Sequence, residues 1–144
     1  MNRQVAVIGS GTEHEGRAEE VGRLLAERDV TVVCGGRGEV MAAAARGAKS
    51  VGGTTIGILP GKNRADANEW IDHVVATGIG HARNLAVVAS GDAVIALGGR
   101  YGTLSEIGLA LTLGRRVVIL EPGWEIDGAL RAATPAEAVE LALS

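Results

Sequence analysis

One pattern recurs along the chain: a short run of β-branched and other apolar residues, then a turn, then a stretch with helical spacing. Continuous apolar runs of this length are typical of strands that are buried on both faces of a parallel sheet. The runs that we predict to be strands are 5–8, 30–33, 54–59, 73–76, 92–97 and 116–120. This alternation predicts an α/β fold, a Rossmann-like parallel β-sheet of about six or seven strands with helices on both faces.

The helical stretches complete this picture. We predict helices over 13–28, from about residue 40 to 50, over 81–90, over 104–113 and from Pro135 to the end, with Thr134 as the cap of the last one. Residues 62–70 are ambiguous between a loop and a short helix, and the segment from Trp124 to Pro135 reads as irregular. The length fits a single domain spanning residues 1–144.

Composition excludes several classes of function. A net charge of −3 and only three aromatic residues argue against nucleic-acid binding. No apolar run approaches the roughly 20 residues that a membrane helix needs, and no signal peptide is visible, so we expect a cytoplasmic protein without a membrane partner. Cys34 is the only cysteine, which excludes an internal disulfide and a cysteine cluster for zinc. We expect no bound metal ion and no resident cofactor.

Four glycine-rich turns follow predicted strands, at Gly9, Gly35, Gly78 and Gly98. In an open parallel sheet the ligand lies outside the carboxyl ends of the strands, which is where all four turns are expected to meet. The first turn does not match a dinucleotide fingerprint, because His14 stands where the third glycine belongs and no acidic residue ends the second strand. A Walker A loop is also missing.

The turn from Gly98 to Thr103 carries the sharpest signal. Its glycines allow positive φ and close approach of a ligand, and the amides of residues 101–104 are expected at a new helix N-terminus, which is an anion-binding geometry. The alternative is structural, because Thr103 and Glu106 have the spacing of a capping box. The sequence leaves both interpretations open.

The remaining ligand class is a phosphorylated small molecule such as a mononucleotide. We expect its phosphate on the Gly98 turn, with the Gly35 turn as the opposite wall. Arg83 is a candidate to neutralise the anion, and its alternative role is that of a solvated helix residue. The predicted binding residues are Gly9, Ser10, Gly35, Gly36, Gly38, Gly98, Gly99, Arg100, Tyr101, Gly102 and Thr103.

Three segments resemble a known superfamily: Gly35-Gly-Arg-Gly-Glu-Val-Met41, His81-Ala-Arg83 and Gly98-Gly-Arg-Tyr-Gly-Thr-Leu-Ser-Glu106. This superfamily holds the Lonely Guy cytokinin-activating phosphoribohydrolases, often mislabelled lysine decarboxylases, and the molybdenum cofactor carrier proteins. More distantly, the chain is similar to the Rossmann-like domain of bacterial DNA-processing proteins.

The resemblance implies a function. The hydrolases of this superfamily cleave the N-glycosidic bond of nucleoside 5′-monophosphates to base and ribose 5-phosphate. The resemblance implies that Arg83 and Glu106 match their catalytic pair. A carboxylate can stabilise the oxocarbenium-like centre that forms as the base departs. Lysine decarboxylation is excluded independently, because a pyridoxal enzyme needs a buried Schiff-base lysine and only Lys49 and Lys62 exist, in helix-end or loop settings.

The chain departs from the hydrolase pattern in three respects. Leu97 stands in place of a proline, Asn84 in place of a lysine, and the chain is shorter than typical hydrolases. These features are closer to the carrier branch, which the resemblance implies to bind a phosphorylated pterin without turnover. Hydrolysis and non-catalytic molybdenum cofactor binding therefore stay open as alternatives.

The predicted helix 104–113 suggests a homo-oligomer. At about 100° per residue its leucines fall on two nearly opposite sides, and a surface helix is expected to be polar on the outer one. We expect an inner side of Leu104, Ile107 and Leu111 and an outer side of Leu109 and Leu113 with Ala110 beside them. A second subunit that covers the outer side predicts a dimer or a tetramer of dimers, with cover by a helix of the same chain as the alternative.

Overall fold

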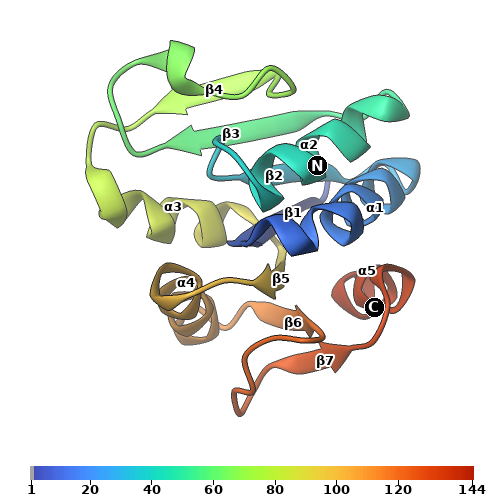
Figure 1. Cartoon of the computed structure of the whole chain (residues 1–144). Coiled ribbons are helices and arrows are strands. Elements are labelled where there is room, and N and C mark those ends of the chain that lie inside the picture. The colour runs from blue at the N-terminus through green and yellow to red at the C-terminus, as the bar shows by residue number, and fades with distance from the viewer. Residues whose placement is uncertain (1) are drawn as a thin grey trace.

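The computed structural model describes residues 2–144, which form one parallel sheet with helices on both faces (Figure 1). The strands are β1 (Gln4–Ser10), β2 (Thr31–Cys34), β3 (Thr55–Leu59), β4 (His73–Ala76), β5 (Ala93–Gly98), β6 (Arg116–Leu120) and β7 (Leu130–Ala132). They lie in the order β4-β3-β2-β1-β5-β6-β7, and every neighbouring pair is parallel. The Rossmann-like α/β prediction is confirmed.

The helices are α1 (Glu15–Glu27), α2 (Val40–Ser50), α3 (Arg83–Ser90), α4 (Tyr101–Thr112) and α5 (Pro135–Leu143), with short 3-10 turns η1 (Thr12–His14), η2 (Arg64–Asp66) and η3 (Gly80–Ala82). Helices α1, α2 and α5 cover one face of the sheet, and α3 and α4 cover the other (Figure 1). None of the helices in residues 2–144 is long and apolar enough to cross a membrane.

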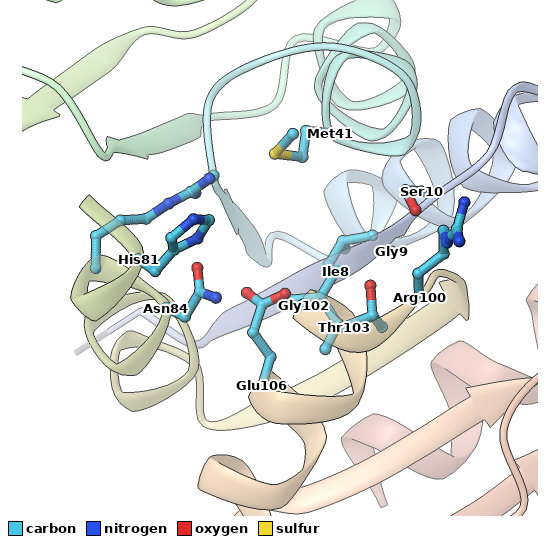
Figure 2. Close-up of a pocket in the computed structure, with 13 residues that line it drawn as sticks. Ile8, Gly9, Ser10, Met41, His81, Asn84, Arg100, Gly102, Thr103 and Glu106 are labelled. Carbon is cyan, nitrogen blue, oxygen red and sulfur yellow. The ribbon is translucent and has the colours of Figure 1, made fainter.

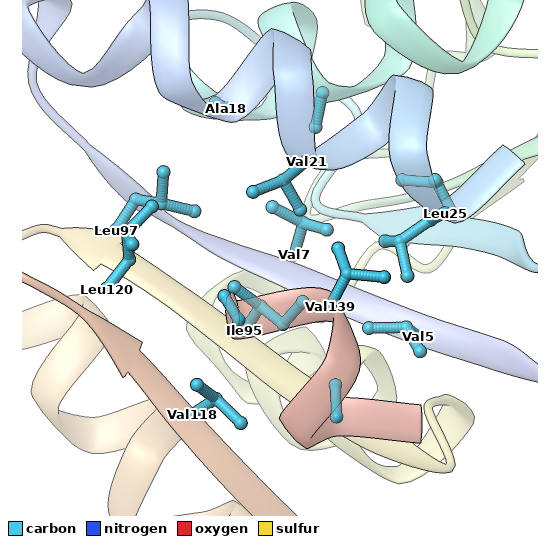
Figure 3. Close-up of a cluster of buried hydrophobic side chains, with 14 of the residues drawn as sticks. Val5, Val7, Ala18, Val21, Leu25, Ile95, Leu97, Val118, Leu120 and Val139 are labelled. Atoms are coloured by element: carbon cyan, nitrogen blue, oxygen red, sulfur yellow. The ribbon is translucent and has the colours of Figure 1, made fainter. Parts of the chain in front are cut away.

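Two apolar clusters hold these layers together. In β1, Val5 and Val7 point to the face of α1 and α5, whereas Ala6 and Ile8 point to the face of α3 and α4. Figure 3 shows the first cluster, where Val21 of α1 lies above the strand side chains and Val139 of α5 lies among them. Because both faces are covered, the strands read as continuous apolar runs rather than as alternating ones.

The predicted elements lie within a few residues of the observed ones, with one omission. Strand β7 falls in the segment that we expected to be irregular. It has only three residues and pairs with β6, so its position comes from the neighbouring strand rather than from its own sequence. The ambiguous segment 62–70 contains only the short turn η2. Thr134 caps α5 as predicted, since its hydroxyl accepts a hydrogen bond from the amide of Glu137 at 3.1 Å.

Helix α4 corrects two expectations. It begins at Tyr101 with Arg100 as the N-cap, so Thr103 lies inside the first turn and the capping-box interpretation is wrong. The expected outer side is also wrong in part. Ala110 is fully buried, and Leu109 packs against a core cluster of its own chain. Trp124, Ile126 and Ala129, from the segment between β6 and β7, pack against the same cluster.

Candidate functional site

The topology creates a crevice beside β1. The chain proceeds from β1 outward to β4 and then returns through α3 to β5 on the other side of β1. Such a reversal of strand order leaves an opening at the carboxyl ends of the two strands, which is where ligands bind in open α/β sheets. A cavity of about 230 Å³ lies at this point (Figure 2). Its walls are Val7, Ile8, Gly9, Ser10, Gly35, Met41, His81, Arg83, Asn84, Arg100, Gly102, Thr103 and Glu106.

Most of the residues singled out in the sequence meet in this cavity. The structure brings together Gly9, Ser10, Gly35, Arg83, Arg100, Gly102, Thr103 and Glu106. It leaves outside the cavity Gly36, Gly38, Gly98, Gly99 and Tyr101. The lining residues that the prediction missed are Val7, Ile8, Met41, His81 and Asn84. His81 and Asn84 flank Arg83 in sequence, and Met41 ends the Gly35 motif, so these positions offered a signal that we did not use.

Gly98 and Gly99 have a different role from the one expected. Their φ angles are 56° and 93°, and a Cβ on Gly99 would lie 2.1 Å from Oγ1 of Thr103. A Cβ on Gly98 would lie 2.3 Å from Cδ2 of the buried His14. The chain itself, rather than a ligand, therefore demands glycine at these two positions. Gly102 differs, because a Cβ added there meets nothing within 4 Å and the residue lines the cavity.

The N-terminus of α4 faces this cavity through Gly102 and Thr103 (Figure 2). The first amides of a helix have no intrahelical acceptor, and together with the helix dipole they favour an anion. The expectation that this set includes Leu104 is wrong, because its amide donates to the carbonyl of Arg100 at 3.0 Å. The amides of residues 101–103 remain at the helix end.

Glu106 lies one turn further along α4 and points into the cavity (Figure 2). Burial raises the pKa of its carboxyl from the ordinary 4.5 to about 7, and the positive charge of Arg83 opposes that rise. The group is therefore close to half ionised at neutral pH. A carboxyl with a perturbed pKa in a cleft is a mark of functional sites.

Arg83 is held by the fold rather than by solvent. Its guanidinium donates to the carbonyl of Ile58 at 3.1 Å, and burial lowers its pKa while Glu106 raises it. Gly35 makes room for it, because a Cβ there would lie 1.9 Å from a guanidinium nitrogen of Arg83. The alternative that Arg83 is a solvated helix residue is therefore wrong.

The single cysteine and the two lysines do not line the cavity. Cys34 is buried beside it, and burial raises the pKa of its thiol to about 11, so the thiol stays protonated and unreactive at neutral pH. Lys49 pairs with Asp72 at 2.9 Å, and neither Lys49 nor Lys62 lines the cavity. Residues 2–144 contain no group of three or more histidine, cysteine or acidic residues placed to hold a metal ion.

A family model and one relative match this chain along nearly its whole length, and other relatives match a shorter part. The model of the SLOG cluster4 family matches residues 2–142. An uncharacterized protein of Archaeoglobus fulgidus is 46% identical over 144 residues, which cover 98% of this chain and 95% of that protein. A cytokinin riboside 5′-monophosphate phosphoribohydrolase of Mycobacterium tuberculosis is 36% identical over 121 residues, which cover 77% of this chain but only 64% of that protein.

Among solved structures, the molybdenum cofactor binding protein from the phototrophic bacterium Rippkaea orientalis is similar with a TM-score of 0.92 and 33% sequence identity. The match covers 98% of this chain and 95% of that one. Family, sequence relatives and structural neighbour agree with the motifs that surround the cavity. The chain belongs to the SLOG cluster4 family, within the superfamily of Lonely Guy phosphoribohydrolases and molybdenum cofactor carriers.

Proposed function

We propose that the protein binds a nucleoside 5′-monophosphate type of ligand in this cavity and cleaves its N-glycosidic bond to base and ribose 5-phosphate. The observation that carries the proposal is Glu106. A carboxyl whose pKa is raised to about 7 by burial is costly to keep ionised in the folded protein, and it lies beside Arg83 in the cavity wall. Binding of an anion alone gives no reason to place a carboxylate there.

The phosphate is assigned to the N-terminus of α4. The free amides of residues 101–103 would donate to its oxygens, and the absence of a side chain on Gly102 lets the phosphate come close. Arg83, across the cavity wall from α4, would compensate the negative charge. With the phosphate there, the sugar lies toward Glu106 on the next turn of the same helix.

The chemistry then follows from one ionised carboxylate. As the bond between C1′ and the base nitrogen breaks, its electron pair leaves with the base and C1′ acquires oxocarbenium character. Ionised Glu106 would stabilise this positive centre and accept a proton from the water that attacks C1′. The departing base takes up one proton, so that nucleotide and water give base and ribose 5-phosphate.

The test is base release from adenosine, guanosine and cytidine 5′-monophosphates by the wild type and Glu106→Gln. The glutamine keeps the shape but cannot carry the charge, so we expect release to fall at least about a hundredfold, the usual size of a general acid–base contribution. Glu69→Gln, an exposed glutamate outside the cavity, is the matched control and should match the wild type. Equal rates in wild type and Glu106→Gln would refute the catalytic role.

A second candidate is non-catalytic binding of the molybdenum cofactor. It is favoured by the match with the Rippkaea orientalis protein, which spans 95% of that chain, whereas the M. tuberculosis hydrolase is covered over only 64% of its length. A thermal-shift screen of nucleoside monophosphates, pterins and molybdate compounds separates the two. Stabilisation by phosphorylated pterins, with no base released from any monophosphate by the wild type, would favour the carrier.

A further inference from the structure

A second recess lies beside the cavity and is not used by the proposed function. It measures about 180 Å³ and is lined by Gly99, Arg100, Tyr101 and Trp124. It lies between the β5–α4 turn and the segment that follows β6, at the carboxyl edge of the sheet where the cavity also lies. Two of the three aromatic residues of the chain meet there. Tyr101 is 77% exposed, so its ring is open to a ligand.

Arg100 connects the two spaces, because it lines both of them. Figure 2 shows the order along the cavity: Asn84, His81 and Glu106 lie at one end, Gly102 and Thr103 in the middle, and Arg100 at the other end. The cavity alone, at about 230 Å³, is smaller than the roughly 300–1,000 Å³ typical of ligand pockets. A ligand of nucleotide size therefore has to extend beyond it, and the recess lies on the side opposite Glu106.

The chemistry of the recess selects what it would take. The rings of Tyr101 and Trp124 offer faces on which a base can stack, and stacking of this kind tolerates any base. The guanidinium of Arg100 suits a phosphate oxygen.

We propose that the ligand is of the dinucleotide class, with a pyrophosphate that runs from the N-terminus of α4 to Arg100 and a second aromatic ring that stacks on Tyr101 and Trp124. This inference rests on the phosphate site of the proposed function. It adds a specificity determinant: the recess distinguishes pyrophosphate-linked molecules that carry a ring at each end from mononucleotides. The first nucleoside remains on the side of Glu106.

The test compares three probes that differ by one part at a time: AMP, ADP and P1,P2-diadenosine diphosphate, with the guanine series in parallel. Affinities are measured by titration calorimetry. We expect the dinucleotide to bind about tenfold more tightly than the diphosphate of the same base, the size of one stacking contact. In Trp70→Phe, where Trp124 is the only tryptophan left, the dinucleotide and not ADP should quench the fluorescence.

Variants of the recess complete the test. Trp124→Leu should abolish the advantage of the dinucleotide and leave the affinity for ADP unchanged. Tyr101→Ala should lower the ratio of dinucleotide affinity to ADP affinity, and Tyr101→Phe, which keeps the ring, should retain that ratio. Trp124→Leu keeps apolar volume where Trp124 packs against the second core cluster. If the dinucleotide binds no better than ADP in the wild type, the recess does not bind a second ring, whereas the phosphate site at α4 is unaffected by this result. If none of the probes binds, the proposed function fails and this inference fails with it.

Discussion

The substitution Glu106→Gln should stabilise the folded protein in a pH-dependent way. The pKa of this carboxyl is raised from 4.5 to about 7 by burial. The folded state therefore holds the proton more tightly than the unfolded state does. Below pH 4.5 the carboxyl is protonated in both states, and the raised pKa has no net effect on the free energy of unfolding. As pH rises from 4.5 to 7 the unfolded state ionises first, so stability of the wild type is lost until the folded carboxyl ionises as well.

The size of the effect follows from the same change in pKa. At about 1.4 kcal/mol per pH unit, the free energy of unfolding of the wild type is lowered by roughly 3 kcal/mol above pH 7 and by about 1 kcal/mol at pH 5. Glutamine fills the same volume without a charge, so Glu106→Gln avoids this loss. The variant should exceed the wild type by roughly 3 kcal/mol at pH 8 and by much less at pH 5.

Urea unfolding at the two pH values measures this difference. The buffers must be free of phosphate, because an anion bound to the folded state would add stability of its own. Glu69→Gln is again the control and should show no pH-dependent gain, since Glu69 is exposed. A Glu106→Gln variant that is equally stable to the wild type at both pH values, or less stable at pH 8, would refute the inference that burial sets the pKa of Glu106.

Three further predictions follow from the same structure. The kcat/KM of base release should rise with pH up to about 7 and then level off, because the ionised form of Glu106 is the active one. A kcat/KM that falls over this range would assign the opposite role to the carboxyl. Gly99→Val should abolish ligand binding and lower the free energy of unfolding in urea by roughly 1–3 kcal/mol, since its Cβ would collide with Thr103 at a φ of 93°. Binding that is retained in calorimetry would contradict this. We propose a homodimer or a tetramer of dimers through the exposed sides of α3 and α4. Light scattering should show an assembly that the double substitution Leu85→Glu with Leu113→Glu disrupts. A wild type that is monomeric at micromolar concentration would end this proposal.

The sequence predicts the sheet well because its central strands are covered on both faces, which forces long apolar runs. Edge strand β7 lacks such a run and was missed. The start of α4 differs from the predicted one for another reason. Thr103 and Glu106 have capping-box spacing, but the positive φ of Gly98 and Gly99 turns the chain so early that the helix begins at Tyr101. Local spacing cannot reveal which of two helix starts the preceding turn permits.

The sequence predicts the presence of Arg83 and Glu106 in the candidate site but not the full lining of the cavity. Gly98, Gly99 and Gly102 look equivalent in sequence. Their difference is three-dimensional, because Gly98 and Gly99 accommodate His14 and Thr103, whereas Gly102 faces open space. For Arg83 the sequence leaves two roles open, an anion partner and a solvated helix residue. The structure decides between them, because the guanidinium lies next to Gly35, a residue far away in the chain.

Of the three departures from the hydrolase pattern, the two that are single residues carry different weight. Leu97 is fully buried in the core and pairs with Gly9 and Leu120, so it affects the pairing of β5 rather than the cavity. Asn84 lines the cavity with Glu106, and an amide there replaces the lysine of the hydrolases by a neutral group. Asn84→Lys should therefore lower the pKa of Glu106, because a nearby positive charge favours the carboxylate.

The pH profile of base release in Asn84→Lys should accordingly shift to lower pH, with Asn84→Gln as the neutral control that leaves the profile of the wild type in place. The same charge should reduce the stability gained from Glu106→Gln at pH 8, since less ionisation cost would remain to be relieved. Because one cause predicts both changes, they must occur together. A shifted rate profile with an unchanged stability difference would show that the lysine acts on the substrate rather than on Glu106, and that Asn84 does not set the ionisation of this site.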